Sequence, residues 1–267
     1  MISQSKVKNY NETKILLEVD GITKEYKEKG FLKKETKNVL NGLSFNIRKG
    51  ECLGIVGESG SGKSTLGRII TGIEKPTKGS IKFNGEDIYK NKNNMIKENI
   101  SIVFQNYVAS VNPRFTVSEI IKEPLIIKNK MKEKDIENKL IELIKAVGLK
   151  EEFLNRYPKE LSGGQLQRVC IARAISTRPK FIMLDEAVSS LDVSTQVEIL
   201  ELLKKLKTKY ELSYIFVTHD LLTITYICDS VIFFKDGKIE EKIDNIDDLE
   251  KVKKDYSKKL LESVIEF

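Results

Sequence analysis

Apolar residues along the chain fall into two kinds of pattern. Short continuous apolar runs predict buried strands, and they occur at 15–19, 39–47, 52–56, 80–83, 100–104, 181–184 and 214–217. Helical spacing of apolar residues predicts helices after residue 62, at 165–176 and at 194–209. Strands that alternate with helices indicate a mostly parallel sheet covered on both faces, with functional residues at the strand carboxyl ends. The fold class is therefore α/β.

Two regions depart from this alternation. The runs at 15–19 and 39–47 flank a Lys/Glu-rich loop that contains Tyr26, and the Asn84-Gly85 turn ends the run at 80–83, which together predict an antiparallel β subdomain. From 106 to 157 the pattern is helical, and Gly148 is placed to end the last helix of this stretch. We therefore expect one domain at 15–265 after an N-terminal tail at 1–14, with a helical subdomain at about 106–176 and a short helical tail at 246–267.

Composition supports a globular chain with a mixed surface. The 267 residues are 40% hydrophobic, and 46 Lys and Arg against 39 Asp and Glu give a net charge of +7. The basic residues are interleaved with acids, which is typical of a solvated surface, although a mild excess also suits nucleotides or an anionic membrane face. The concentrated basic stripe of a nucleic-acid-binding protein is missing from the sequence, so no nucleic-acid partner is expected.

The cysteines and the hydropathy predict a reduced, cytoplasmic setting. Cys52, Cys170 and Cys228 lie far apart in apolar segments, without metal-ligand spacing. The N-terminus is polar, and no apolar run approaches the length that spans a bilayer. We expect a chain on the cytoplasmic side of the cell membrane, bound to it peripherally at most.

A glycine-rich stretch between the run at 52–56 and the next helix predicts a phosphate-binding loop. Glycines let backbone N–H groups turn toward a phosphate, and the helix that follows points its positive N-terminus at the anion. Lys63 would supply charge to the β- and γ-phosphates, and the Ser64 hydroxyl would bind Mg²⁺. The predicted ATP-binding residues of this loop are Gly57, Glu58, Ser59, Gly60, Ser61, Gly62, Lys63, Ser64 and Thr65.

Two acids end the strand at 181–184. Carboxylates at the end of a buried strand are costly unless a cation receives them, and Mg²⁺ fits beside a phosphate loop. Asp185 would bind the metal through water, and Glu186 would act as the general base that polarises the attacking water. The alternative is a strand that simply ends in two surface acids.

A second anion-accepting turn opens the helix at 165–176. Ser162, Gly163, Gly164 and Gln165 present a helix N-terminus without bulky side chains. Two phosphate cradles in one chain make sense if the second serves the ATP of another subunit, so that two chains close head-to-tail around two nucleotides.

With its LSGGQ string at 161–165, the sequence resembles the ATP-binding cassette ATPases, whose signature motif this is. The resemblance implies that Gln105 contacts Mg²⁺ and the attacking water, and that Asp192 lies in a loop touching the opposite subunit. It implies that His219, the sole histidine, binds the γ-phosphate and Glu186, and that Tyr26 stacks on adenine, with Phe31 a nearby aromatic. A structural histidine and a surface tyrosine are the alternatives.

Within this family, the segments 103–114 and 185–192 look like the peptide and nickel importer branch, and 161–173 is similar to nickel-import ATP-binding subunits. Peptide-importer subunits run on into a cysteine-containing extension, whereas this sequence stops after its helical tail. The resemblance therefore implies an ATPase that energises nickel uptake, with a dipeptide or oligopeptide importer as the alternative. A cassette ATPase acting on ribosomes or DNA is more distant, because such chains carry two cassettes or zinc-bearing and coiled-coil insertions.

The same resemblance implies a set of partners. They are two integral-membrane permease subunits, a second and unlike ATPase subunit, and an extracytoplasmic solute-binding protein. With one histidine and scattered cysteines, the chain offers no credible Ni²⁺ site, so nickel itself would pass through the partners.

Overall fold

The computed structural model describes residues 14–29, 34–90, 98–127 and 133–265. Its strands are β1 (Ile15–Lys29), β2 (Lys34–Arg48), β3 (Cys52–Val56), β4 (Lys78–Phe83), β5 (Glu86–Asp87), β6 (Ile100–Val103), β7 (Phe181–Asp185), β8 (Ser213–Thr218), β9 (Ser230–Lys235) and β10 (Lys238–Ile243). Its α-helices are α1 (Lys63–Ile70), α3 (Val117–Ile127), α4 (Glu133–Ala146), α5 (Gly163–Ile175), α6 (Val193–Tyr210), α7 (Leu221–Ile227) and α8 (Asp255–Ile265). Most of the predicted N-terminal tail, and Phe31, lie outside the described residues.

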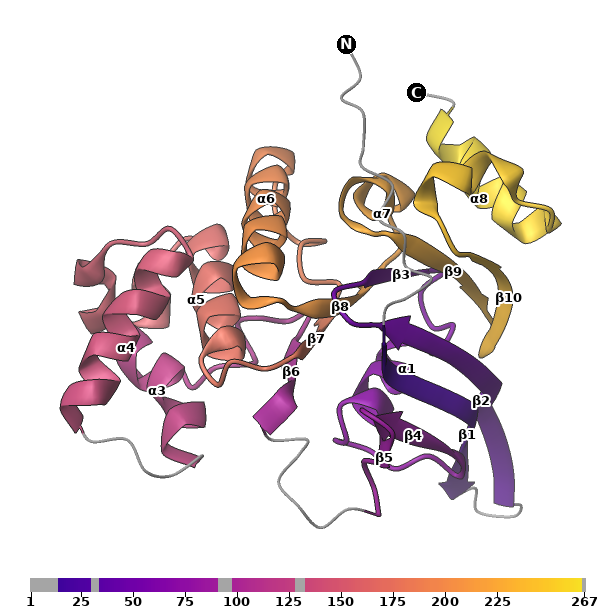
Figure 1. Ribbon diagram of the computed structural model, residues 1–267, viewed down its shortest axis with the longest axis horizontal. Helices are drawn as coiled ribbons and strands as arrows, with labels where there is room; N and C mark the ends of the chain where they lie inside the picture. The colour runs from indigo at the N-terminus through magenta and orange to yellow at the C-terminus, as the bar shows by residue number, and fades with distance from the viewer. Residues whose placement is uncertain (1–13, 30–33, 91–97, 128–132, 266–267) are drawn as a thin grey trace.

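A six-stranded sheet in the order β10-β9-β3-β8-β7-β6 forms the centre of the molecule (Figure 1). The strands from β9 to β6 are parallel, and β10 pairs antiparallel with β9 at one edge. Since β3, β6, β7 and β8 run in the same direction, their carboxyl ends meet along one edge of the sheet. The predicted α/β class with a mostly parallel sheet is confirmed.

The predicted antiparallel subdomain is a second sheet in the order β2-β1-β4-β5. Both long strands extend farther than their apolar runs, because β1 continues to Lys29 and Tyr26 pairs with Lys37 of β2. The prediction of a loop around Tyr26 was therefore wrong. Hydropathy misses such an extension because exposed strand ends pair through backbone groups and tolerate polar side chains on both faces.

Two hydrophobic clusters lie on opposite faces of the central sheet. Leu53 and Ile55 of β3 pack toward α1 and the antiparallel sheet, while Cys52 and Val56 pack toward α5, α6 and α7. This alternation follows from the two-residue period of a strand, and it explains why every residue of β3 is buried. The central sheet is thus covered on both faces.

Helices α3, α4 and α5 lie together at one side of the molecule, away from the antiparallel sheet (Figure 1). The expected subdomain falls in this region, but residues 106–116 form turns, so helix begins only at Val117. Gly148 follows α4 with a φ of 75°, a left-handed conformation that glycine adopts readily. In the described part of the chain, no helix combines the length and the apolar composition needed to cross a membrane.

Two of the three cysteines lie side by side in the core, although 176 positions separate them in the sequence. Cys52 and Cys228 are both buried, with their Sγ atoms 3.6 Å apart, and all three cysteines are free thiols. Burial raises the pKa of Cys170 and of Cys228, so both are protonated at neutral pH. They act as small apolar core residues.

Candidate active site

The predicted phosphate loop connects the carboxyl end of β3 to the first residue of α1. Gly57 is required there because a Cβ atom would lie 2.0 Å from the carbonyl oxygen of Phe234. Gly62, with a φ of 109°, turns the chain directly into the helix. Residues 58–60 are exposed at the tip of the loop, whereas Ser61, Lys63 and Thr65 are buried at its base.

Lys63 lies inside the loop that precedes it. Its Nζ donates hydrogen bonds to the carbonyl oxygens of Gly57 and Glu58, each over 2.7 Å. Burial lowers the pKa of Lys63, while the nearby carboxylates of Glu186 and Asp185 act in the opposite direction. The loop therefore closes around an ammonium group placed where an incoming phosphate needs positive charge.

Asp185, the last residue of β7, is 7% exposed and accepts a hydrogen bond from Ser64 Oγ over 3.2 Å. Burial raises the pKa of Asp185, and the hydrogen bond from Ser64 partly opposes this. A hydroxyl and a buried carboxylate side by side are the oxygen donors that Mg²⁺ takes beside phosphates. The pair thus fits the predicted Mg²⁺ ligands. Among the described residues, no group of three or more His, Cys, Asp or Glu is arranged to bind a metal.

Glu186 meets two of the other predicted catalytic residues. Its Oε2 accepts a hydrogen bond from Gln105 Nε2 over 2.8 Å, and it lies 3.7 Å from Nδ1 of His219. Gln105 follows β6, Glu186 follows β7 and His219 follows β8, so the shared direction of three strands brings them together. Glu186 has a φ of 46°, a strained conformation for a residue with a side chain, and such strain is concentrated at functional sites.

The serine-glycine turn is placed elsewhere. Ser162 caps α5, since its Oγ accepts a hydrogen bond from the Gln165 N–H and its own N–H donates to Gln165 Oε1. A Cβ atom on Gly164 would lie 2.5 Å from Cγ2 of Thr195 at the start of α6. The turn therefore packs against α6.

Asp192 lies next to this turn as the N-cap of α6. Its carboxylate accepts hydrogen bonds from the Thr195 N–H, from Thr195 Oγ1 and from Ser194 Oγ. These hydrogen bonds hold the pKa of Asp192 well below its usual range. Its contacts thus fix the loop before α6, and its role toward a second subunit stays a prediction.

Tyr26 lies on β1, and its hydroxyl donates a hydrogen bond to Oε1 of Glu74 over 2.6 Å. Sequence patterns did not single out Glu74, nor Tyr256 of α8, whose hydroxyl accepts a hydrogen bond from the Glu58 N–H over 3.3 Å. Both contacts join residues remote in sequence, and no local motif points to either.

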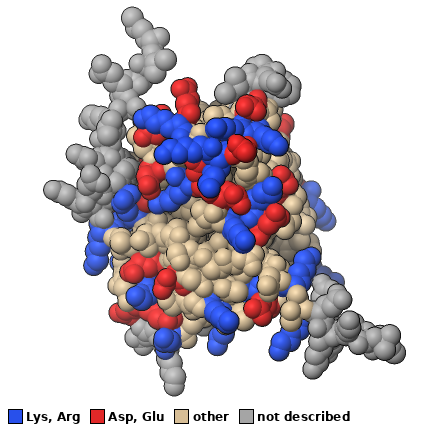
Figure 2. All heavy atoms as spheres, turned by 90° about the vertical axis from the view of Figure 1, so that its right-hand side faces the viewer, with Lys and Arg blue, Asp and Glu red and all other residues tan. Residues whose placement is uncertain are grey.

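Basic and acidic side chains are interspersed on the face of the molecule shown in Figure 2, around an uncharged area. This agrees with the interleaving in the sequence, and this face presents no block of a single charge.

Comparisons with known proteins agree with these features. Residues 40–189 match a protein-family model described as ABC transporter. The metal-staphylopine import system ATP-binding protein CntF of Staphylococcus aureus is 42% identical over 94% of this chain and 100% of its own length. The dipeptide transport ATP-binding protein DppF of Haemophilus influenzae is 42% identical over 85% of this chain and 71% of its own.

The nickel import ATP-binding protein NikE of Shigella sonnei is 40% identical over 85% of this chain and 86% of its own. Among solved structures, a dimeric ATP-binding cassette in a post-hydrolysis state, bound to ADP and Pi, is similar with a TM-score of 0.76. The sequence identity to that structure is 33%, and the match covers 85% of this chain and 97% of the chain in that structure.

Proposed function

The chain belongs to the ABC transporter family, and from this premise we propose that it is the ATP-hydrolysing subunit of an importer whose cargo is nickel. The observation that carries the choice of cargo is the similarity to two metal-import ATPases, one for metal-staphylopine and one for nickel, over most of this chain. The same comparisons support, without choosing a cargo, an ATPase subunit of an importer for metals or peptides.

In the proposed reaction, Lys63 and the loop at residues 57–65 bind the β- and γ-phosphates of ATP. Ser64, Asp185 acting through water, and Gln105 would hold Mg²⁺, which neutralises phosphate charge when bound. Glu186 accepts a proton from the attacking water, and Gln105, 2.8 Å from its carboxylate, orients that carboxylate. His219 Nδ1 lies 3.7 Å from the same oxygen of Glu186, and the imidazole would donate a hydrogen bond to the γ-phosphate.

Closure of two ATPase subunits would complete each site. The turn at Ser162, Gly164 and Gln165 would reach the nucleotide bound to the partner, and Asp192 would lie at the contact between the subunits. Support comes from the packing of this turn against Thr195 at the start of α6. Because ATP would bind the closed form better than the open form, it would shift the population toward closure.

A groove with a mixed lining, which includes the charged residues Glu123 and Arg173, suggests where closure acts on the permease. A cavity of about 290 Å³ lies between β6, α3 and α5, and its lining includes Phe104, Pro124 and Ile127. Ile127 is 65% exposed, so a permease segment could bury it. Phe104 directly precedes Gln105, which would couple this groove to the nucleotide site.

The proposed assembly contains two integral-membrane permease subunits, an unlike second ATPase and an extracytoplasmic solute-binding protein. This chain would bind peripherally at the cytoplasmic face of the membrane and would contact neither nucleic acid nor nickel directly. The peptide importer is the second candidate, because the dipeptide transport relative is as similar in identity as the metal-staphylopine one.

Deleting the gene and measuring cellular metal tests the cargo. We expect cellular nickel and the activity of nickel enzymes to fall, and a plasmid copy of the gene to restore both. A copy carrying Glu186→Gln should fail to restore them. Normal nickel content together with lost growth on oligopeptides would contradict the nickel proposal and select the peptide importer.

A further inference from the structure

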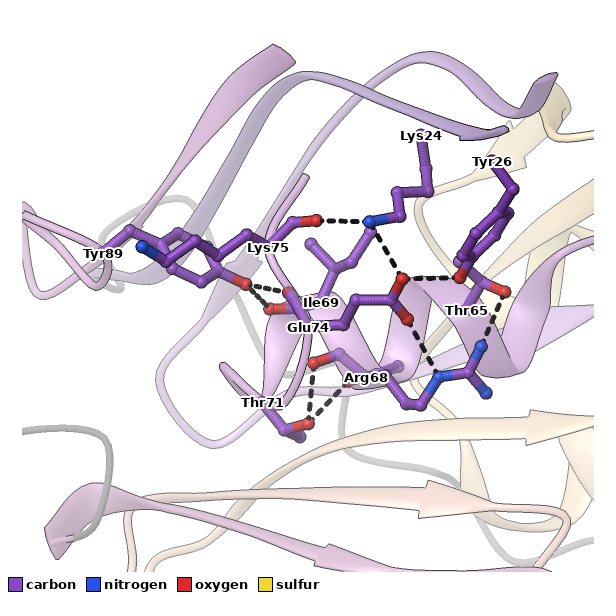
Figure 3. A network of polar contacts seen from close by, with 10 residues as sticks. Lys24, Tyr26, Thr65, Arg68, Ile69, Thr71, Glu74, Lys75 and Tyr89 are labelled. Atoms are coloured by element: carbon purple, nitrogen blue, oxygen red, sulfur yellow. Dashed lines mark hydrogen bonds and ion pairs between the residues drawn. The ribbon is translucent and has the colours of Figure 1, made fainter. Parts of the chain in front are cut away.

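A network of polar contacts joins β1 to the loop after α1, and Glu74 is at its centre (Figure 3). Oε1 of Glu74 accepts a hydrogen bond from the Tyr26 hydroxyl over 2.6 Å and lies 2.9 Å from Nζ of Lys24. Oε2 accepts a hydrogen bond from Nε of Arg68 over 3.1 Å. Both carboxylate oxygens are therefore engaged, and the side chain of Glu74 is held in one orientation.

The same network reaches the first turn of α1. Arg68 donates a second hydrogen bond to Oγ1 of Thr65 over 3.1 Å, and Thr65 is part of the predicted phosphate site. The backbone of Glu74 is fixed as well, since its carbonyl oxygen accepts a hydrogen bond from the Tyr89 hydroxyl over 2.6 Å. Glu74 thus connects the aromatic residue on β1 with the helix that follows the phosphate loop.

The charges in the network favour the ionised carboxylate. Burial by itself would raise the pKa of Glu74, but hydrogen bonds from Lys24, Tyr26 and Arg68 outweigh burial and lower it to about 2. At neutral pH the Tyr26 hydroxyl therefore donates to a full negative charge, which strengthens the bond relative to one between neutral groups. The Lys24 ammonium lies 5.1 Å from the centre of the Tyr26 ring, over one of its faces.

These contacts restrict Tyr26 in a way that suits a stacking platform. A half-buried tyrosine without a partner for its hydroxyl could rotate, and ordering it on binding would cost conformational entropy. With the hydroxyl bound to Glu74 and one face covered by Lys24, the ring keeps one orientation and offers an incoming base only its opposite face.

We propose that Glu74 is a positioning residue that fixes the Tyr26 ring for stacking on the adenine of ATP. The inference rests on the proposed nucleotide site and adds a residue outside the motifs that define it. Glu74 would act on the base and not on the phosphates, although Arg68 links it to Thr65.

Binding of two ligands that share a triphosphate, but not a base, tests this role. The affinities of ATP and of inorganic tripolyphosphate, each with Mg²⁺, would be measured by calorimetry on the full chain and on the variants Glu74→Gln and Tyr26→Phe. We expect each variant to bind ATP about threefold to tenfold more weakly. Tripolyphosphate should bind all three proteins equally, and the double variant should bind ATP no more weakly than either single variant.

Glu18→Gln is the matched control, because Glu18 lies on the same strand and forms only a loose, exposed ion pair with Lys82 at 3.8 Å. It should leave both affinities unchanged. Equal losses for ATP and tripolyphosphate in Glu74→Gln would overturn the proposal, and so would additive effects in the double variant or an unchanged ATP affinity. If the unmodified chain bound neither ligand, the nucleotide site itself would be wrong, a result distinct from failure of Glu74 alone.

Discussion

Gln105 and Glu186 are joined by a hydrogen bond of 2.8 Å, from Nε2 to Oε2, although 81 positions separate them in the sequence. Gln105 lies just beyond β6, and Glu186 directly follows β7. Because β6 and β7 are parallel neighbours, their register sets the distance between the two residues. The bond holds the Glu186 carboxylate at the edge of the sheet from which the phosphate loop also starts. A general base beside a bound triphosphate needs a fixed position, and this role for Glu186 stays a prediction.

Replacing Glu186 with glutamine should remove the base and keep its size and its contact with Gln105. We expect ATP hydrolysis to fall at least about a hundredfold, with ATP binding retained. With the partner ATPase present, a closed dimer filled with ATP should then accumulate, which light scattering with and without MgATP would detect. Glu152→Gln removes a carboxylate that forms an exposed ion pair with Arg156 at 3.6 Å, and it should leave turnover unchanged. Unchanged turnover in Glu186→Gln would show that another group acts as the base.

The central sheet and the phosphate loop could be predicted because both are encoded locally. A continuous apolar run such as 52–56 is typical of a strand buried on both faces, and a glycine-rich segment directly after it needs no distant residue to be recognised. The acids after β7 and the histidine after β8 could be placed at the same edge because parallel strands share a direction.

Contacts between remote segments could not be predicted in this way. Tyr256 meets Glu58 across 198 positions, and the contact of Glu74 with Tyr26 depends on how the antiparallel sheet packs beside α1. The extension of β1 to Lys29 was missed because backbone pairing, and not side-chain hydropathy, continues the strand. Cys52 and Cys228 likewise come together only through the packing of α7 and β9 on β3.

Glycine at position 164 could serve packing against Thr195 or close approach to the nucleotide of the partner subunit. The variant Gly164→Ala, with a second change at Thr195, separates these two roles. The new Cβ atom would lie 2.5 Å from Cγ2 of Thr195, so the variant should lose about 1–3 kcal/mol of unfolding free energy. Adding Thr195→Ser removes that methyl group and keeps the hydroxyl that donates to Asp192. We expect the double variant to recover stability in urea unfolding.

Gly164→Ala should also lower ATPase activity, because the alanine side chain blocks close approach to the nucleotide of the partner subunit. The double variant Gly164→Ala, Thr195→Ser keeps that alanine, so its activity should stay low although its stability recovers. Recovery of both stability and activity would mean that Gly164 serves packing alone. The Thr195→Ser variant by itself should match the unmodified chain in both measurements.

Tyr256→Phe tests whether α8 supports the phosphate loop. The Tyr256 hydroxyl accepts a hydrogen bond from the Glu58 N–H over 3.3 Å, while Lys63 binds the Glu58 carbonyl from inside the loop over 2.7 Å. Losing the outer contact should loosen the loop before nucleotide binds, and we expect KM for ATP to rise about twofold to threefold with kcat unchanged. Tyr226→Phe, which removes a hydroxyl bound to Glu201 on the surface, should change neither constant. A fall in kcat without a change in KM would contradict this role for Tyr256.

The Glu74 network should also make the stability of the protein depend on pH in acid. The pKa of Glu74 is about 2 in the folded chain and 4.5 in its ordinary state, so the unfolded chain takes up the proton first as pH falls. The stabilisation from Glu74 is therefore complete above about pH 4.5 and is lost progressively toward pH 2. Urea unfolding between pH 3 and pH 7 should show a smaller loss of unfolding free energy in Glu74→Gln than in the unmodified chain, because the glutamine does not titrate. Glu18→Gln, on the same strand, should keep the full pH dependence, and parallel curves for Glu74→Gln and the unmodified chain would show that the network contributes nothing through its charge.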